Sequence, residues 1–175
     1  NNIVKNAGIS KGLLFHYFTS KKELFEALIR FVIHTLRDAI VEKINWEETD
    51  LFERLKQATI VKLEVSRVYP HMFDFMKNIA AYKKAGSIES LFEMYKGYGL
   101  DLEQIYKDFY TRNVDYSKFR DPSIIAETTN IVRWSLEKYT EEQLLTLGED
   151  NRLDYSKAAA DLSHYVDILK DAFYS

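Results

Sequence analysis

The chain has no cysteine, and only two prolines and six glycines occur among its 175 residues. The absence of cysteine excludes disulfides, thiolate metal sites and cysteine nucleophiles. The scarcity of proline and glycine leaves long uninterrupted windows that favour helices. No apolar run approaches the ~20 residues needed to cross a bilayer, and no signal segment is visible. We therefore expect a cytoplasmic protein without a membrane partner.

Residue patterns for catalysis or metal binding are also lacking. The four histidines are His16, His34, His71 and His164, each far from the others in sequence. Asp161 and His164 form the only acid-x-x-His pair, whereas a di-iron bundle needs two such pairs and two further carboxylates. No P-loop, nucleotide-binding glycine fingerprint or serine elbow occurs. We expect no catalytic residue, no metal and no cofactor.

What the chain does have is apolar spacing with a helical period along its length, and no sustained strand-like alternation. This pattern predicts an all-α fold. The expected helices cover about 24–44, 51–69, 71–85 and 88–109, then one that starts at Asp121-Pro122 and a last one over 155–173. Ser87 is expected to cap the 88–109 helix, and Gly97 and Gly99 are expected to bend it.

The first thirty residues carry the most specific pattern. Gly8 can adopt the positive φ that ends a helix, and Ser10 can cap a short helix that follows at once. In that helix Leu14 and Phe18 share an inner face at i, i+4, which turns Lys11, Phe15, His16 and Tyr17 at least partly outward. Ser20 and Glu23 then form a capping box for the next helix. The spacing predicts a helix-turn-helix whose outward face enters a DNA major groove.

The segment Ala-Gly-Ile-Ser-Lys-Gly-Leu-Leu-Phe-His-Tyr-Phe, followed by Ser-Lys-Lys-Glu-Leu, resembles the DNA-binding signature of TetR-type (tetracycline-repressor-like) regulators from about Ile3 to Leu28. The resemblance implies a helix-turn-helix head with its linking helix at 1–44 and a larger helical effector-binding and dimerisation domain at 45–175. Family members have a first helix and a full second helix before the glycine turn. Since this chain starts at Asn1, we expect its N-terminal few tens of residues to be missing.

The family pattern, together with the capping position, assigns DNA binding to Ser10, Lys11, Gly12, Phe15, His16, Tyr17 and Lys21. Lys11 can donate to guanine and Phe15 can meet a thymine methyl, whereas Tyr17 and Lys21 suit phosphates. Gly12 would let the backbone approach the groove closely. Charge agrees with this assignment, because residues 1–30 carry a net charge of +3 and the whole chain a net charge of −3.

In the larger domain the resemblance implies an effector pocket, for which we single out Phe75, Met76, Tyr95 and Trp134. Aromatic and thioether side chains suit a mostly apolar ligand, although for any single one of these residues ordinary core packing is the more common role. The last two helices are expected to form a four-helix dimer interface. Its predicted residues are Ile131, Ala158, Ala159, Leu162, Tyr165, Val166 and Leu169, and the alternative for them is an intramolecular core.

The sequence therefore predicts a ligand-responsive transcriptional regulator, most often a repressor in this family, that binds operator DNA as a homodimer and is released by a small, mostly apolar effector. The alternative is a helical small-molecule sensor or interaction module without DNA binding. Lys11, Tyr17 and Lys21 favour the first of these.

Overall fold

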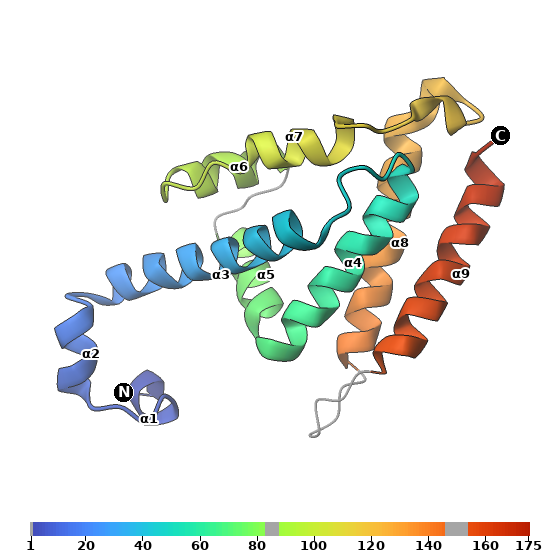
Figure 1. Cartoon of the computed structure of the whole chain (residues 1–175). Helices are drawn as coiled ribbons and strands as arrows, with labels where there is room; N and C mark the ends of the chain where they lie inside the picture. Colours follow the sequence, from blue (N-terminus) through green and yellow to red (C-terminus); the bar gives the residue numbers. More distant parts are fainter. Residues whose placement is uncertain (1, 83–87, 146–153) are drawn as a thin grey trace.

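A computed structural model describes residues 2–82, 88–145 and 154–175 of the chain (Figure 1). These residues form helices and no strand, and one antiparallel bridge joins Phe119 to Tyr174. The elements in chain order are α1 (Asn2–Asn6), α2 (Lys11–Tyr17), α3 (Lys21–Lys43), α4 (Leu51–Val68), α5 (Met72–Tyr82), α6 (Ile88–Lys96), α7 (Glu103–Thr111), the 3₁₀ turns η1 (Tyr116–Lys118) and η2 (Pro122–Ile124), α8 (Ile125–Leu145) and α9 (Tyr155–Phe173). The predicted all-α fold is confirmed. None of the described helices is both long and apolar enough to span a membrane.

Side-chain caps set the beginnings of several helices. Ser10 and Ser20 each accept a hydrogen bond from the backbone N–H three residues later, and Asp154 does the same for α9. Asp50 accepts from the N–H groups of Phe52 and of the residue after it, which starts α4. Such caps satisfy N–H groups that have no partner inside the helix. The helix starts predicted at these positions are therefore present.

The region predicted as one bent helix over 88–109 is instead two helices, α6 and α7. Gly99 adopts φ +78°, a left-handed conformation that ends a helix and that other residues rarely take. The N–H of Leu100 turns back to the carbonyl of Tyr95, which closes the end of α6. The expectation of a mere bend was wrong, because the positive φ at Gly99 stops the helix. The expected cap at Ser87 lies outside the described residues.

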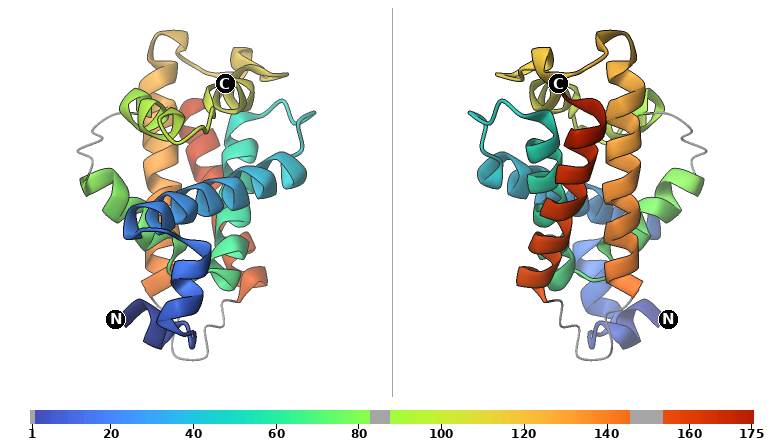
Figure 2. Two further views of the ribbon diagram at one scale, coloured as in Figure 1. Left: turned by 90° about the vertical axis from the view of Figure 1, so that its left-hand side faces the viewer. Right: turned by 90° about the vertical axis from the view of Figure 1, so that its right-hand side faces the viewer.

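Helices α4, α8 and α9 form the main core of the molecule. They lie side by side in Figure 2, and their facing side chains Phe52, Val132, Leu162 and Val166 are fully buried. Ala158 joins the same cluster. Ala158, Leu162 and Val166 were predicted to form an interface between two chains, and here they pack within one chain. The alternative of an intramolecular core holds for these three.

Helix α3 connects the N-terminal end of the chain to this core. Its first turns extend toward α2, away from α8 and α9, and its later turns cross α4 (Figure 1). Ile29 and Ile33 are buried against Ile79 of α5 and Tyr95 of α6. Val32 packs on the other side with α4 and α5. A displacement of α5 or α6 therefore acts directly on the helix that carries α2.

A buried arginine joins three segments of the chain that lie apart in sequence. Arg54 of α4 has no exposed surface, and its Nη1 donates to the carbonyls of Phe109 (2.9 Å) and Arg112 (2.8 Å) at the end of α7. Its Nη2 donates to the carbonyls of Trp46 and Glu48 in the turn after α3. The carbonyls at a helix end have no partner inside the helix, so Arg54 satisfies them from outside.

Candidate DNA-binding head and ligand cavity

The residues predicted to bind DNA lie on one short, capped helix and at the start of the next. Gly8 adopts φ +64° as predicted and ends α1, and a two-residue link leads to α2. The Oγ of Ser10 accepts from the N–H of Leu13 at 3.0 Å. We call residues 1–28 the head and the remainder the body. The turn between α1 and α2 is thus fixed by a glycine conformation and a side-chain cap.

Helix α2 has the predicted division into two faces. Leu14 and Phe18 are half-buried, whereas Lys11, Phe15 and Tyr17 are exposed, Tyr17 with 67% of its surface free. His16 is exposed as well, and its ring meets the Tyr17 ring edge-on at 5.2 Å between centroids. The Nζ of Lys11 lies 5.8 Å from the centre of the Phe15 ring. Cationic, aromatic and hydrogen-bonding groups are therefore presented together on the outer surface.

Gly12 lies on this exposed helix with open space around it. A Cβ built on Gly12 would meet only the Oγ of Ser10, at 3.8 Å, which is an ordinary contact. Packing within the chain therefore does not require glycine here. A surface that docks against α2 and needs close approach to its backbone would require it.

The beginning of α3 departs from the predicted capping box in one detail. Ser20 accepts from the N–H of Glu23 at 3.1 Å as expected. The Glu23 carboxylate, however, accepts from the hydroxyl and backbone N–H of Thr19, at 2.6 and 2.7 Å, rather than from Ser20. These two hydrogen bonds lower the pKa of Glu23. Lys21 and Lys22 remain exposed at the positive end of α3.

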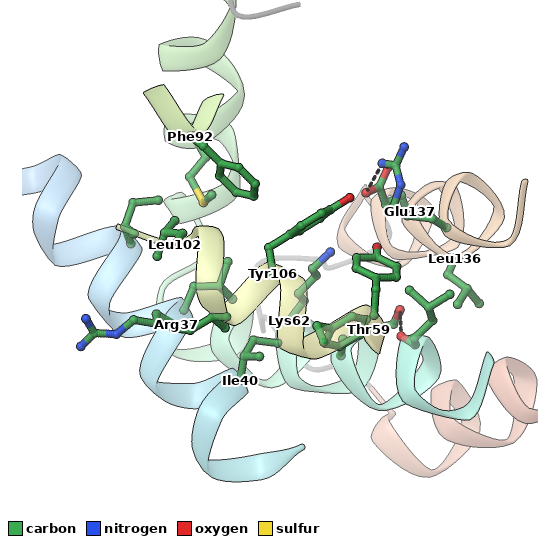
Figure 3. A pocket seen from close by; sticks show the side chains of 18 of the residues that line it. Arg37, Ile40, Thr59, Lys62, Phe92, Leu102, Tyr106, Leu136 and Glu137 are labelled. Atoms are coloured by element: carbon green, nitrogen blue, oxygen red, sulfur yellow. Dashed lines mark hydrogen bonds and ion pairs between the residues drawn. The ribbon is translucent and has the colours of Figure 1, made fainter. Parts of the chain in front are cut away.

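The body contains a partly open pocket of about 710 Å³ between α3, α4 and the helices α5 to α8, which we call the cavity. Most of its wall is apolar or aromatic, and Figure 3 shows Phe92, Leu102 and Tyr106 facing it. Three of the four predicted pocket residues, Met76, Tyr95 and Trp134, line this cavity. Its volume falls in the range of small-molecule sites, which is roughly 300–1,000 Å³.

Phe75 is the predicted pocket residue that does not line the cavity. Its ring meets the Phe25 ring of α3 edge-on, with the centroids 5.9 Å apart. Trp134 reaches the cavity but keeps 57% of its surface exposed, so it lies at the rim rather than the floor. An aromatic residue on α5 could face either side of that helix, and sequence spacing did not decide which.

Sequence reasoning missed the polar groups of the cavity. Lys62 of α4 and Glu137 of α8 face it (Figure 3), and Arg133 of α8 also lines it. The two nitrogen–oxygen distances between Arg133 and Glu137 are 3.0 and 3.2 Å. Burial lowers the pKa of Lys62, although the charge of Glu137 acts to raise it. The sequence offered one signal for Lys62, namely its position three residues after Thr59, a spacing that puts two side chains on the same face of a helix. Thr59 also lines the cavity.

Of the remaining residues predicted for a dimer interface, Ile131 of α8 and Tyr165 of α9 are exposed. Ala159 is half-buried, and Leu169 is half-buried and packs against the main core. Ile168, which was not predicted, is also exposed, with 51% of its surface free. In the right-hand view of Figure 2 no other helix lies in front of α8 and α9. Apolar side chains are thus available on an uncovered helix pair.

No group of three or more His, Asp or Glu side chains is placed to hold a metal ion within the part of the chain that the structure describes. Asp161 and His164, which form the acid-x-x-His pair of the sequence, lie on α9. The Asp161 carboxylate is 3.4 Å from the hydroxyl of Tyr139, and His164 is exposed.

Comparison with known proteins identifies the head. Residues 1–28 match the model of the family described as bacterial regulatory proteins, tetR family. The HTH-type transcriptional regulator BetI of Escherichia coli is 36% identical over 58 residues, which are 33% of this chain and 30% of that protein. BetI of Klebsiella pneumoniae is 40% identical over 43 residues, 25% of this chain and 22% of that protein. The predicted resemblance to TetR-type regulators is confirmed.

One similarity extends beyond the head. The nucleoid occlusion factor SlmA of Edwardsiella ictaluri is 29% identical over 110 residues, which are 61% of this chain and 54% of that protein. The matched part of the chain therefore spans between about a fifth and a third of BetI and about half of SlmA. The head thus matches the tetR family model, and the body is all-α in the residues that the structure describes.

Proposed function

We propose that this protein is a ligand-responsive transcriptional regulator that binds operator DNA as a homodimer, acts as a repressor, and leaves DNA when a small effector enters the body. Its proposed place of action is the cytoplasm. The observation that carries the proposal is the outer face of α2, where Lys11, Phe15, His16 and Tyr17 are exposed together. Two of the similar proteins named above are described as HTH-type transcriptional regulators.

The assignment of contacts follows from the chemistry of each group. Lys11 donates to guanine O6 or N7 in the major groove, and the ring of Phe15 packs against a thymine methyl. Tyr17 and Lys21 bind phosphates, helped by the positive N-terminal end of α3. Because the Glu23 carboxylate is already held by Thr19, its charge is partly satisfied locally and opposes phosphate binding less.

Salt-dependent binding tests this assignment. Duplexes selected from a random pool, and the DNA upstream of the protein's own coding sequence, are titrated with the full-length protein at several salt concentrations. Lys21→Ala should weaken binding equally on all sequences and lower the salt slope by about 1. Lys11→Ala should cost about 1–3 kcal/mol on the selected sequence and relax preference at one position.

Lys96→Ala is a matched control, because Lys96 is an exposed lysine of the body. It should leave both affinity and salt slope unchanged. Unchanged affinity after removal of both Lys11 and Tyr17 would refute the assigned reading face. If no duplex binds even at low salt, the alternative of a helical sensor or interaction module without DNA binding is the correct one.

The proposed dimer uses α8 and α9. Two recognition helices must reach half-sites about 34 Å apart or a multiple of it, which a two-fold dimer achieves. The exposed apolar residues Ile131, Tyr165 and Ile168 supply surface for such an interface. Analytical ultracentrifugation tests it: Ile168→Glu should convert the dimer to monomer. Val41→Glu is the control, since Val41 is also an exposed apolar residue but lies on α3. A dimer unaffected by Ile168→Glu places the interface elsewhere.

Effector control is proposed to act through α3. Ile33, Leu36 and Ile40 of α3 line the cavity, while the N-terminal end of the same helix follows α2 directly. A ligand that prefers a different placement of α3 changes the separation of the two heads. Such a ligand shifts DNA affinity only by its difference in affinity for the two arrangements.

A further inference from the structure

The cavity contains one positive charge that no neighbour neutralises. Arg133 is paired with Glu137 on the same helix. Arg37 is paired with Asp38, with nitrogen–oxygen distances of 2.6 and 2.8 Å, and its guanidinium points away from the cavity (Figure 3). The Lys62 ammonium makes no hydrogen bond or ion pair with any of the described residues, although the Lys62 backbone carbonyl accepts from the Ser66 hydroxyl at 2.8 Å. With Lys62 protonated, the side chains that line the cavity carry one positive charge that no paired carboxylate balances.

The position of Lys62 makes its charge available to a ligand. It extends from α4 into the cavity toward Tyr106 and Glu137 (Figure 3). It is half-buried, so its ammonium has lost part of its hydration without gaining a partner. Its pKa is lowered, because burial outweighs the attraction of Glu137. A charged group held in this way gains more from an incoming counter-ion than an exposed lysine does.

The apolar and aromatic side chains of the cavity wall determine what kind of group can fill the cavity beside Lys62. Side chains from α6 and α7 supply aromatic surface, among them Phe92, Tyr106 and Phe109, and α3 supplies aliphatic surface through Ile33 and Leu36. A space of about 710 Å³ accommodates on the order of 20 non-hydrogen atoms at about 30 Å³ each. Tyr110 stays neutral, since burial strongly raises its pKa, and a hydrogen bond with the Tyr106 side chain raises that pKa further.

We infer that the cavity binds an organic monocarboxylate with an apolar body, whose carboxylate pairs with Lys62 while the body occupies the aromatic and aliphatic part of the wall. This inference rests on the proposed effector role of the cavity and names its ligand class. A cationic ligand fits less well, because Glu137 already pairs with Arg133 and the net charge is positive. A neutral ligand leaves Lys62 without a partner.

A series of ligands that differ only in the polar end group tests the inference. Decanoate, decanol and decylamine are titrated into the full-length protein by calorimetry at pH 7, and 2-naphthoate and 2-naphthol repeat the comparison with a rigid aromatic body. We expect each carboxylate to bind at least tenfold more tightly than its neutral counterpart. Decylamine should bind most weakly of the decyl series.

Lys62→Met removes the charge and keeps a similar volume. It should weaken decanoate binding at least tenfold and leave decanol binding unchanged or tighter. Lys107→Met is the matched control, because Lys107 is an exposed lysine of α7 that does not line the cavity. It should bind all the ligands as the unaltered protein does.

Three outcomes would overturn the inference: equal affinity for decanoate and decanol, tighter binding of decylamine, or no binding of either carboxylate. The same holds if Lys62→Met and Lys107→Met behave alike. DNA release is measured separately. If decanoate binds through Lys62 but leaves DNA affinity unchanged, the ligand class stands and the effector role fails.

Discussion

The head and the body of this chain hold their structure in different ways. In α1 and α2 no residue is buried, and the conformation is set by the Gly8 turn and the Ser10 cap. In α4 most residues are buried, and they contact segments that lie far away in the sequence. Local hydrogen bonds therefore order the head, and long-range packing orders the body. Substitutions in the two regions should therefore differ in how much they lower the unfolding free energy and in how much of the chain they affect.

The largest expected effect is in the body, at Arg54. Arg54→Met keeps the apolar stem but removes the donors to the carbonyls of Phe109, Arg112, Trp46 and Glu48. Buried acceptors left unpaired cost about 1–3 kcal/mol each before relaxation, so we expect a loss of about 3–5 kcal/mol in unfolding free energy. Urea unfolding followed by circular dichroism measures it.

Arg112→Met is the control for this comparison. The Arg112 side chain is more than half exposed, and its nearest contact with the Glu47 carboxylate is 3.8 Å. An exposed pair of this kind contributes about 0–1 kcal/mol. A similar loss in both variants would show that the interior hydrogen bonds of Arg54 do not hold the body together.

A smaller effect, also in the body, depends on pH. Burial alone would raise the pKa of Asp50, but the hydrogen bond from Lys170, the N–H of Glu53 and the nearby lysine charges outweigh it and lower that pKa. A lowered carboxyl pKa stabilises the folded state above its unfolded value near ~4, and this contribution is lost as the pH falls through the folded pKa.

Asp50→Asn therefore should cost about 1–2 kcal/mol at pH 7 and make the unfolding free energy less sensitive to acid between about pH 5 and pH 2. The amide can still cap α4, so the change reports on charge. Asp167→Asn, at an exposed position of α9, should follow the unaltered protein. Equal acid sensitivity in Asp50→Asn would assign the pH dependence to other carboxyl groups.

The difference between local hydrogen bonds in the head and long-range packing in the body also explains which features could be predicted from the sequence. The head was predicted residue by residue, because Gly8, Ser10 and Ser20 act on backbone within four positions of themselves. The helix starts after Asp50 and Asp121 could be predicted from the sequence in the same way. The break at Gly99 was read as a bend, since spacing does not reveal the sign of φ.

In the body the partners of a side chain depend on how helices pack, which a helical period does not specify. Leu162 and Val166 repeat as interface residues do, yet they face α4 and α8 of the same chain. Phe75 and Met76 are neighbours in sequence, but only Met76 reaches the cavity. Lys62 faces a cavity that is completed by α8, and α8 lies more than sixty positions later in the chain.

In the head, loss of a cap should have a smaller and local effect. Ser20→Ala removes the acceptor for the N–H of Glu23 and should cost the start of α3 about 1 kcal/mol. Hydrogen exchange should rise in the first turn of α3, and the urea midpoint of the body should stay nearly unchanged. Ser20→Asp keeps the cap and should restore protection. A shift of the whole unfolding curve would show that head and body unfold together.

The smallest expected effect on stability is that of a substitution at Gly12, which tests the helical stability of α2 and DNA binding by the head separately. Gly12→Ala should stabilise α2 by about 0.5–1 kcal/mol, because alanine favours helix and its Cβ meets only the Oγ of Ser10 at 3.8 Å. Amide exchange in α2 should slow. DNA affinity should nevertheless fall, because the added methyl group keeps the backbone from the groove that we propose it approaches. Tighter DNA binding by Gly12→Ala would instead mean that the helical order of α2 limits DNA affinity. It would refute the proposal that the backbone at Gly12 approaches the groove closely.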